Sequence, residues 1–515
     1  MAFDNSSQLY GRSLLKTNLR LTGDIAEDAD IVGSILAEVM TTHEKNADEA
    51  TKLFEIYLND SNSWTKTKET RNEINNKVSI PTAWALTRTL NGYCFGEPIK
   101  YIARGKADQD GQQINKQALV EQLSAMLDYA NNHDATVMAT LSASICGLGY
   151  KLCLPANQEE IAETGVPFVI NDKFIYPQLA GIVVTNESIP KEVLGFLIGD
   201  YYNEKGEKDG NQYTCWTKYA QYVFKDGEGD KPYVLIKQIM GEQEVDFVPL
   251  VSNRIPLVEI ERNFLRKGDW EVAVDLLQLR HNLVSNRIDD IQQIVDYVLV
   301  LMNCKFETEE DRKTAIQNRL LELKATDPTN KPSIEILKNA LDQNGIQTFE
   351  DYIDLIIQEC VGVPNRQERG GGGGDTGQAV KYRNGFRDLE NNAGFIIPKM
   401  DKAELKLLAL CVAYCQNNSE TKDVGELKPY DIRCKFMRTL NDDIVSSSQA
   451  YATYVTNGLT MEDALILSKS GTDPSEIAAN ARKQAEEESV ETATTTTTTP
   501  TETVETTVKT TEETA

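Results

Sequence analysis

The residue pattern that first suggests chemistry is a run of five glycines, Gly370–Gly374. Glycine-rich loops bind phosphate when they read GxxxxGK(S/T), because the lysine reaches the β/γ-phosphates and the hydroxyl binds magnesium. The nearest register runs from Gly372 to Gly377, but Gln378 and Ala379 stand where these two residues are required. The run also follows an expected helix, whereas a nucleotide loop follows a strand. The sequence therefore predicts a loop between two helices and gives little support for nucleotide binding.

Other residues that could do acid–base chemistry are unspecific. Adjacent acidic pairs such as Asp289-Asp290, Glu309-Glu310 and Asp442-Asp443 are expected by chance among 79 carboxylates. A solvated face is therefore a better interpretation of these pairs than a general acid–base dyad. No GxSxG, HExxH or GxGxxG motif occurs in the chain. We expect neither enzymatic activity nor a cofactor.

Metal ligands and reactive thiols are poorly placed as well. The nine cysteines form no CxxC pair, and the three histidines, His43, His133 and His281, lie far apart in the sequence. Zinc sites need clustered ligands, so no metal site is predicted. Cys146 and Cys411 lie in apolar runs and are expected to be buried free thiols. His281 is expected to be an ordinary packing or surface residue of a long helix.

Composition restricts the classes of partner. The 515 residues, 40% of them hydrophobic, suffice for roughly three or four domain-sized units with cores. The formal charge of -26 argues against a protein that holds nucleic acid through its phosphates, but a conduit for a sliding duplex should repel it. Without a run of about 18 apolar residues or the apolar core of a signal peptide, the sequence indicates a soluble protein that acts in a cytoplasm.

The first half of the chain is predicted to be helical and then β-rich. The polar N-terminal region has helical patches at Ile31–Leu36 and Ala47–Leu58, and a helix that begins near Pro81 is expected to end at Asn91-Gly92. One long helix is predicted over 117–148. Short runs of β-forming residues between turn residues then predict an antiparallel sheet that ends at 253–261.

The second half is predicted to contain two helices that flank a charged stretch. Apolar residues recur every three to five positions from Asp269 to Met302 and predict a helix on the order of 50 Å long. The charged stretch 304–346 separates it from a helix at Thr348–Val361. These two helices could pair in one antiparallel column. Such a column fits one repeating unit, or stave, of a ring better than it fits a monomer.

Beyond the glycine run, helices are predicted at 378–392 and, after Pro398, at 401–416. A strand-like run at 430–440 precedes a helical region that extends to about Glu488. The Thr/Glu-rich end cannot bury a core and is expected to be disordered.

Five short blocks of sequence occur in a characteristic order. They are NGYCFGEPIKY (91–101), SASICGLGYKL (142–152), the block from NRIPLVEIE to DYVLVLMN (253–303), CVGVPNRQERGGGGGDTGQAVKY (360–382) and DIRCKFMRTLNDD (431–443), with NGLTMEDALIL and DPSEIAANARKQAEEE after it. Each block is a weak motif, but in this order they resemble the portal proteins of long-tailed double-stranded-DNA bacteriophages. Thr376-Gly377 departs from the usual Ser-Gly of that family, and the glycine run is richer than usual.

The resemblance implies an α+β portal fold with a β-rich and helical wing, a long-helix stem, a small clip and a helical crown, assembled as a homo-oligomeric ring of about twelve copies. It suggests a wing at 1–265, stem helices at 266–303 and 347–363, a clip at 304–346, a glycine-rich tunnel loop at 364–378, a kinked wing helix and crown at 379–488, and a disordered tail at 489–515.

The resemblance also implies partners and a location. The ring would lie at one capsid vertex of the virion, and in the host cytoplasm during assembly. It would nucleate the procapsid with scaffolding and major capsid protein, and dock first the terminase large subunit and then head-completion or connector proteins. Double-stranded DNA would pass through it, and no membrane contact is expected. Terminase would hydrolyse ATP, which agrees with the missing phosphate-loop residues. Twelve copies would carry roughly -310 charges, a field that permits sliding.

Two groups of residues follow as candidate contacts. The candidates for transient contact with DNA in the tunnel are Arg366, Arg369, Gly370, Gly371, Gly372, Gly373, Gly374, Lys381 and Arg383. The candidates for contact with terminase and connector proteins at the clip are Glu309, Glu310 and Arg312. For each basic residue, a solvated charge beside a loop is an equally good interpretation.

Two other classes of function stay open. One is an oligomeric virion or capsid-assembly protein without a DNA tunnel. The other, a nucleotide-dependent enzyme, requires that the glycine run bind phosphate. A ring with a central hole would distinguish the portal from both.

Overall fold

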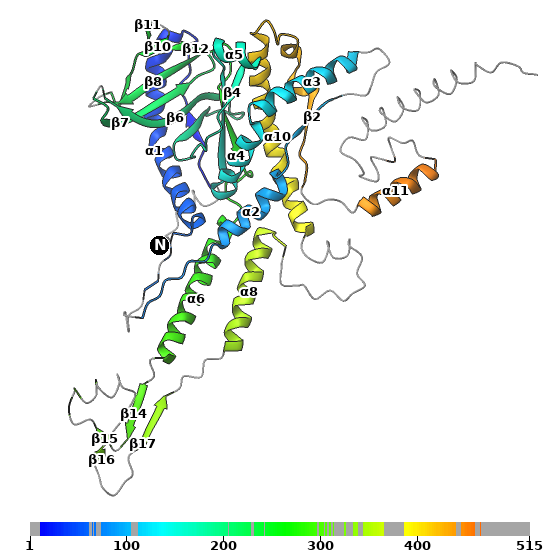
Figure 1. Cartoon of the computed structure of the whole chain (residues 1–515). Coiled ribbons are helices and arrows are strands. Elements are labelled where there is room, and N and C mark those ends of the chain that lie inside the picture. The colour runs from blue at the N-terminus through cyan, green and yellow to red at the C-terminus, as the bar shows by residue number, and fades with distance from the viewer. Residues whose placement is uncertain are drawn as a thin grey trace, which may run out of the picture. The chain divides into compact units, whose positions relative to one another are not determined.

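The computed structural model describes residues 11–60, 74–104, 112–203, 205–227, 231–240, 243–295, 343–364, 386–438 and 444–458, together with scattered positions within 64–67 and 298–337 and residue 464. Helices and strands both contribute large parts of it, which confirms the α+β class (Figure 1). The chain divides into a main unit, Met1–Asp375 with Ala379–Thr439, and a second unit, Thr376–Gln378 with Leu440–Ala515. Within the described ranges, no helix has the length and hydrophobicity that a membrane span requires.

The helices of the main unit are α1 (Ile25–Tyr57), α2 (Thr82–Phe95), α3 (Gln112–Tyr129), α4 (Asn132–Cys146), α5 (Gln158–Thr164), α6 (Val274–Val295), α8 (Gln343–Val361) and α10 (Phe386–Gln416). Its short 3-10 turns are η2 (Glu271–Ala273), η3 (Val424–Glu426) and η4 (Pro429–Asp431). The second unit contains α11 (Ile444–Thr456).

The strands are β1 (Leu15–Thr17), β2 (Lys100–Ala103), β3 (Leu148–Pro155), β4 (Phe168–Ile170), β5 (Ala180–Thr185), β6 (Glu192–Tyr202), β7 (Lys208–Trp216), β8 (Ala220–Asp226), β9 (Tyr233–Leu235), β10 (Gln238–Met240), β11 (Gln243–Val245), β12 (Val248–Pro249), β13 (Leu257–Glu261), β14 (Val298–Met302), β15 (Cys304–Lys305), β16 (Lys324–Ala325), β17 (Ser333–Leu337) and β18 (Ile432–Lys435).

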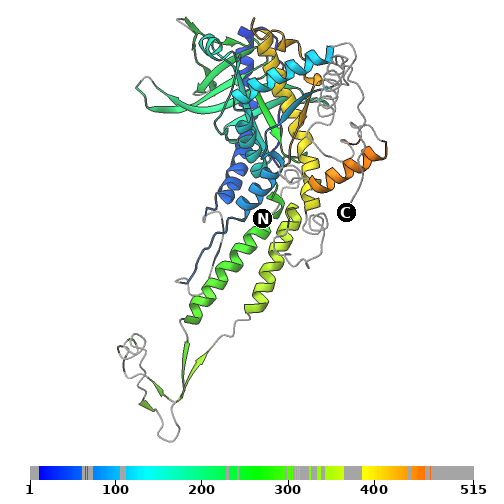
Figure 2. The same ribbon diagram turned by 45° about the vertical axis from the view of Figure 1, so that its right-hand side comes forward.

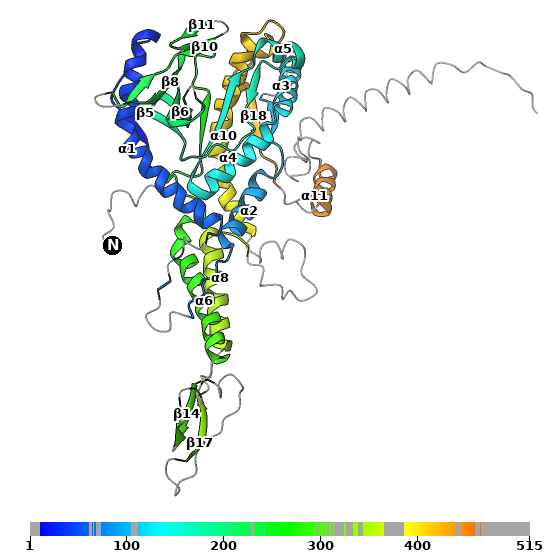
Figure 3. The same ribbon diagram turned by 60° about the vertical axis from the view of Figure 1, so that its left-hand side comes forward.

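The largest sheet has the order β1-β5-β6-β7-β8-β12, with β9 also paired to β8. All its pairs are antiparallel, as predicted, except that β1 runs parallel to β5. Helix α1 packs along this sheet (Figure 3). The core between them is lined by Val32, Ile35, Leu36 and Val39 of α1 and by Val183, Leu194, Phe196 and Tyr222 of the sheet. The two helical patches expected near the N-terminus are therefore parts of one helix.

A second core lies around the three-stranded sheet β13-β3-β4. Helix α4 packs on β3 so closely that a Cβ atom at Gly149 would lie 1.9 Å from the carbonyl oxygen of Ala139. Helix α10 packs against β3, β4 and β13 and buries Leu407, Leu408 and Cys411. Only glycine fits at position 149, because any side chain would separate helix and strand.

Two helix boundaries differ from the prediction. Helix α2 continues through Asn91 and Gly92 to Phe95, since the Asn91 side chain is buried and donates a hydrogen bond to the Val137 carbonyl. The single helix predicted over 117–148 is two helices, α3 and α4. Between them Asn131 adopts a left-handed backbone with φ 55°, a conformation that asparagine tolerates better than most residues.

The predicted helix from Asp269 to Met302 is also too long. Helix α6 occupies only Val274–Val295, and Val298–Met302 forms strand β14, which pairs in antiparallel register with β17. In Figure 2 these two strands are the pair of green arrows beyond the lower end of α6. The run VLVLM consists only of apolar residues, two of them β-branched. Such a run favours a strand and does not continue the one-sided apolar pattern of a surface helix.

The separate helices expected on either side of Pro398 are one helix, α10. A proline inside a helix removes one backbone hydrogen bond and costs about 3 kcal/mol. Burial of Ile396 and Met400 on both sides of it offsets this cost. The strand expected at 430–440 is confirmed as β18 at Ile432–Lys435, and it pairs with β2.

The cysteines are mostly buried thiols, as predicted for Cys146 and Cys411. Among the eight whose side chains the structure describes, seven are buried and Cys360 is exposed. Burial raises the pKa of Cys146 to about 11, so its reactive thiolate form is scarce at neutral pH.

We expect one rapidly labelled thiol in native Cys304→Ser protein, a background that removes the cysteine whose side chain is not described. A maleimide reagent followed by peptide mass spectrometry should find the label at Cys360, and Cys360→Ser should abolish the fast phase. Cys146 should react only on unfolding. Fast labelling of Cys146 in the native protein would contradict the burial argument.

Candidate functional site: the helix pair α6 and α8

Helices α6 and α8 lie side by side and run antiparallel (Figures 1 and 2). Two ion pairs fix their register. Arg280 forms a bidentate pair with Asp354, with 2.9 Å between Nη2 and Oδ2, and Arg287 Nη1 lies 2.7 Å from Glu350 Oε2. The residue number rises along α6 while that of its partner falls along α8. The antiparallel column predicted from the sequence is confirmed for this part of the chain.

One side of α8 is apolar and buried. Ile353, Ile357 and Val361 are buried at successive turns of that helix. Arg280 also donates from Nη1 to the Thr82 hydroxyl at 2.7 Å, which ties the pair to the start of α2. Residues spaced four apart lie on one face of a helix, so α8 presents a continuous apolar stripe to its neighbours.

A second face of α6 is buried by a segment from the N-terminal part of the chain. We call this segment, as described at Trp64, 66–67 and 74–80, the strap. The buried residues of α6 recur at every fourth position and are Leu277, His281, Ser285 and Asp289. The last three contact the strap directly. The strap therefore covers the part of this face that carries His281, Ser285 and Asp289.

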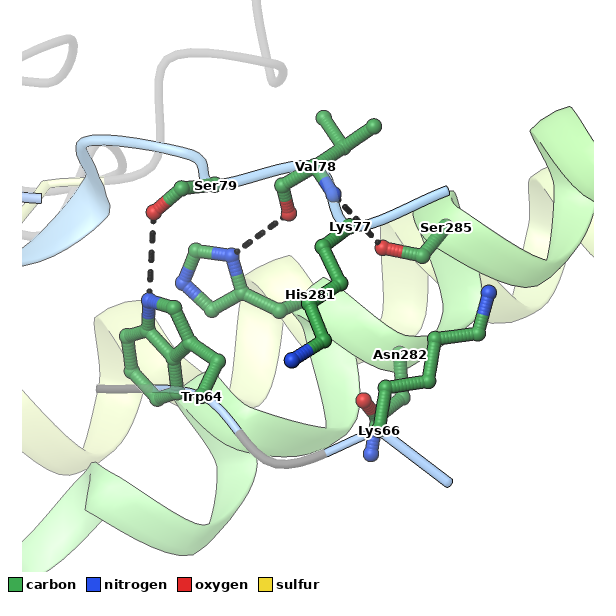
Figure 4. Close-up of a pocket in the computed structure, with 8 residues that line it drawn as sticks. All are labelled: Trp64, Lys66, Lys77, Val78, Ser79, His281, Asn282 and Ser285. Carbon is green, nitrogen blue, oxygen red and sulfur yellow. Dashed lines mark hydrogen bonds between the residues drawn. The ribbon is translucent and has the colours of Figure 1, made fainter. Parts of the chain in front are cut away.

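The strap closes over His281 (Figure 4). The indole of Trp64 lies against the imidazole with 3.8 Å between ring centroids, and its Nε1 donates to the Ser79 hydroxyl at 3.1 Å. The backbone N–H of Ile80 lies 3.0 Å from His281 Nδ1, and the carbonyl oxygen of Val78 lies 3.2 Å from the same nitrogen. His281 is thus a packing residue, as expected, but a hydrogen-bonded one.

Charge is neutralised locally under the strap. Lys66 Nζ lies 2.7 Å from Asp289 Oδ2, and both side chains are almost fully buried. The other carboxylate oxygen accepts from the Asn76 backbone N–H and side-chain amide, both at 2.8 Å. Burial is the main reason that the pKa of His281 lies below its ordinary value, and Arg280 lowers it further, although the Val78 carbonyl acts in the opposite direction. The imidazole is therefore neutral at pH 7.

The start of α6 is anchored by a cluster of ion pairs around Trp270. Arg262 binds Asp269 in a bidentate pair at 2.7 and 2.8 Å, and Arg12 Nη2 lies 2.5 Å from Glu271 Oε1. Between these acids, Trp270 is fully buried and donates from Nε1 to the Thr87 hydroxyl of α2 at 2.8 Å. These contacts fix where the helix pair leaves the sheet-bearing part of the main unit.

The residues singled out from sequence mostly lie outside the described residues. This applies to Arg366, Arg369, Gly370, Gly371, Gly372, Gly373, Gly374, Lys381 and Arg383, and also to Glu309 and Arg312. Glu310 is described and exposed. The structure thus leaves the tunnel-loop and clip assignments as predictions.

The strap itself was missed by sequence reasoning. The interpretation of Asp289-Asp290 as a solvated face is wrong for Asp289, which is only 2% exposed. A signal was present, because Leu277, His281, Ser285 and Asp289 repeat every four residues. It was hidden because three of the four are polar, and polar stripes usually face solvent. Within the described parts of the chain, no group of three or more His, Cys, Asp or Glu residues could hold a metal ion.

Comparison with known proteins gives one family. The family model described as "Phage portal protein, SPP1 Gp6-like" matches residues 36–491. That range includes α6, α8 and the strap. No curated protein matches the chain significantly.

Proposed function

The chain belongs to the SPP1 Gp6-like family of phage portal proteins, and we propose that it forms the oligomeric channel at one capsid vertex through which the phage genome is packaged and ejected. The observation that carries this proposal is the match over 36–491, most of the chain. The family is structural and not catalytic. The antiparallel pair α6 and α8 supports the proposal, because a helix column of this kind serves naturally as one stave of a ring.

We divide the chain accordingly. The wing is 1–265 and the crown with its preceding wing helix is 379–488. The stem comprises 266–303 and 347–363, which contain α6 and all of α8 except its first four residues, 343–346. The clip, 304–346, would dock the terminase large subunit and later the head-completion proteins, and 364–378 would be the tunnel loop. Assembly of the procapsid would involve scaffolding and major capsid proteins, in the host cytoplasm.

The net charge of the chain favours a channel through which DNA slides over one that holds DNA. The chain carries -26, so a ring of about twelve copies would repel phosphates on average and let a duplex slide. The basic residues beside the glycine run, Arg366, Arg369, Lys381 and Arg383, would touch phosphates briefly. Five consecutive glycines allow a loop to change conformation as the duplex passes.

We expect purified protein to form rings with a central hole, without nucleotide or metal. Negative-stain microscopy together with light scattering on a sizing column would show them, with a mass of about twelve chains. A monomer at all micromolar concentrations would contradict the proposal. A compact oligomer without a hole would favour an assembly protein that has no DNA tunnel.

The clip proposal predicts a separate loss of packaging. Replacing Glu309, Glu310 and Arg312 by alanine should lower the DNA packaged per procapsid several-fold, because docking surfaces depend on a few charged contacts. Ring formation should be unchanged, since Glu310 is exposed. Alanine at the exposed Glu163 of α5 likewise removes one net negative charge and provides a charge-matched control. Normal packaging by the clip variant would place the terminase contacts elsewhere.

A further inference from the structure

The spacing of backbone N–H groups along the strap matches the spacing of helical turns along α6. The backbone N–H groups of Asn76, Val78 and Ile80 donate to side chains of α6 at 2.8, 3.0 and 3.0 Å. Their acceptors are Asp289 Oδ1, Ser285 Oγ and His281 Nδ1, in that order. Two residues of extended chain advance about 6.6 Å, and four residues of helix about 6 Å. Every second backbone N–H of the strap therefore lies opposite a side chain on a successive turn of α6.

Of these three acceptors, only the imidazole of His281 gains a proton near neutral pH. The N–H of Ile80 requires a lone pair on Nδ1, which means that the neutral ring carries its proton on Nε2. When the ring takes up a second proton, Nδ1 becomes a donor. It can then donate to the Val78 carbonyl oxygen at 3.2 Å, but the Ile80 N–H loses its acceptor.

We propose that the strap is a releasable latch on α6, and that protonation of His281 opens it. The latch concerns this chain's own folding and does not depend on the proposed channel function. If that function holds, the latch controls whether one buried face of a stem helix becomes free.

The charges around His281 favour release over a simple exchange of hydrogen bonds. From the strap, Lys66 and Lys77 line the same pocket as the imidazole. From α6, Arg280 lies next to it in sequence. The negative groups nearby are already engaged, Asp289 by Lys66 and Asp354 of α8 by Arg280. An imidazolium ion beneath the strap would add a positive charge beside two ion pairs that are already neutral, at a site that is 2% exposed, which is unfavourable.

The latch should open more often as the pH falls. The closed latch holds a neutral imidazole whose pKa is depressed by burial, while the open latch has an ordinary one near 6.5. The open state therefore binds more protons, and the closed state loses stability as the pH falls below the ordinary value. The population of the open state should therefore be higher at about pH 5.5 than at pH 7.5, by at most about ten-fold, which is the limit for a closed state that takes up no proton.

Hydrogen–deuterium exchange of the peptide that contains 74–80 tests this on the assembled, full-length protein. After correction for intrinsic chemical exchange, the rate in wild type should be several-fold higher at pH 5.5 than at pH 7.5, with about ten-fold as the upper limit. A peptide from the sheet core, within β6, should show a ratio near one. A wild-type strap with a ratio near one would overturn the proposal.

Two variants identify the titrating group. His281→Asn keeps an acceptor near the Nδ1 position and cannot be protonated, so its ratio should fall to about one. Asp289→Asn keeps the acceptor for the Asn76 N–H and should retain the wild-type ratio, at a faster absolute rate because Lys66 loses its partner. A ratio that persists in His281→Asn, or disappears in Asp289→Asn, would overturn the assignment. Should His281→Asn already exchange freely at pH 7.5, the ratio in Asp289→Asn decides alone.

Discussion

Lys151→Ala is expected to lower the free energy of unfolding by about 3–5 kcal/mol, the usual cost of leaving a buried charge without its partner. Lys151 Nζ makes three hydrogen bonds inside the second core, to Glu404 Oε2 at 2.8 Å, Asn132 Oδ1 at 2.9 Å and Thr136 Oγ1 at 2.6 Å. Its side chain is 1% exposed and that of Glu404 is 0% exposed. Removal of the ammonium group therefore leaves a carboxylate in an apolar interior.

The carboxylate side of this network explains why the loss should be large. Glu404 Oε1 accepts from the Tyr101 hydroxyl at 2.6 Å and from Asn132 Nδ2 at 2.8 Å. Burial alone would raise the pKa of Glu404, but Lys151, Tyr101 and Asn132 together hold it below its ordinary value. This depressed pKa stabilises the fold above the ordinary carboxyl pKa, and the contribution is lost as the pH falls through the folded value. In Lys151→Ala the carboxyl should protonate, so its deficit should shrink in acid.

Chemical denaturation at neutral and acid pH would measure the loss. The matched control is the double variant Lys151→Met with Glu404→Leu, which replaces the pair by apolar groups of similar size and should recover most of the stability. A single Lys151→Ala variant within about 1 kcal/mol of wild type would mean that water or rearrangement compensates the carboxylate.

Sequence patterns predicted the elements that are built from runs or repeats of apolar residues. The short runs of β-forming residues between turn residues indicated the strands that become β5 to β8. The periodic apolar residues after Asp269 indicate a helix that pairs with α8. Both inferences depend only on apolar residues, whose burial dominates folding.

The parts that could not be predicted depend on polar residues brought together by the tertiary fold. Lys151 and Glu404 are separated by 253 positions, and nothing in either local sequence distinguishes them from surface charges. The same is true of Lys66 and Asp289, separated by 223 positions. The helix boundary at Val295 was also missed, because the strand β14 requires its partner β17, more than thirty residues later, and hairpin pairing at that distance leaves no periodic signal.

Trp270→Ala should have the second large effect, and it should be visible in assembly as well as in stability. Truncating a buried tryptophan costs about 3–5 kcal/mol, and Trp270 is 0% exposed. It also stands directly before η2, the turn that leads into α6. Its neighbours Asp269 and Glu271 form ion pairs with Arg262 and Arg12 that connect the helix to the sheet-bearing part of the chain. A cavity at this point would loosen the direction in which the helix pair projects.

Two controls separate packing from other effects at this junction. Trp270→Phe keeps most of the apolar volume and loses the hydrogen bond from Nε1 to Thr87, so it should cost about 1 kcal/mol for the bond and still form rings. Val272→Ala, two residues away and 65% exposed, should change stability by less than about 0.5 kcal/mol. Thermal unfolding and the yield of rings in negative stain are to be measured on all three variants. If Trp270→Ala unfolds earlier but assembles at the wild-type yield, the junction stabilises the subunit without orienting the helix pair. If Trp270→Ala loses rings while Trp270→Phe keeps them, the volume of this one side chain sets the direction of the proposed stem.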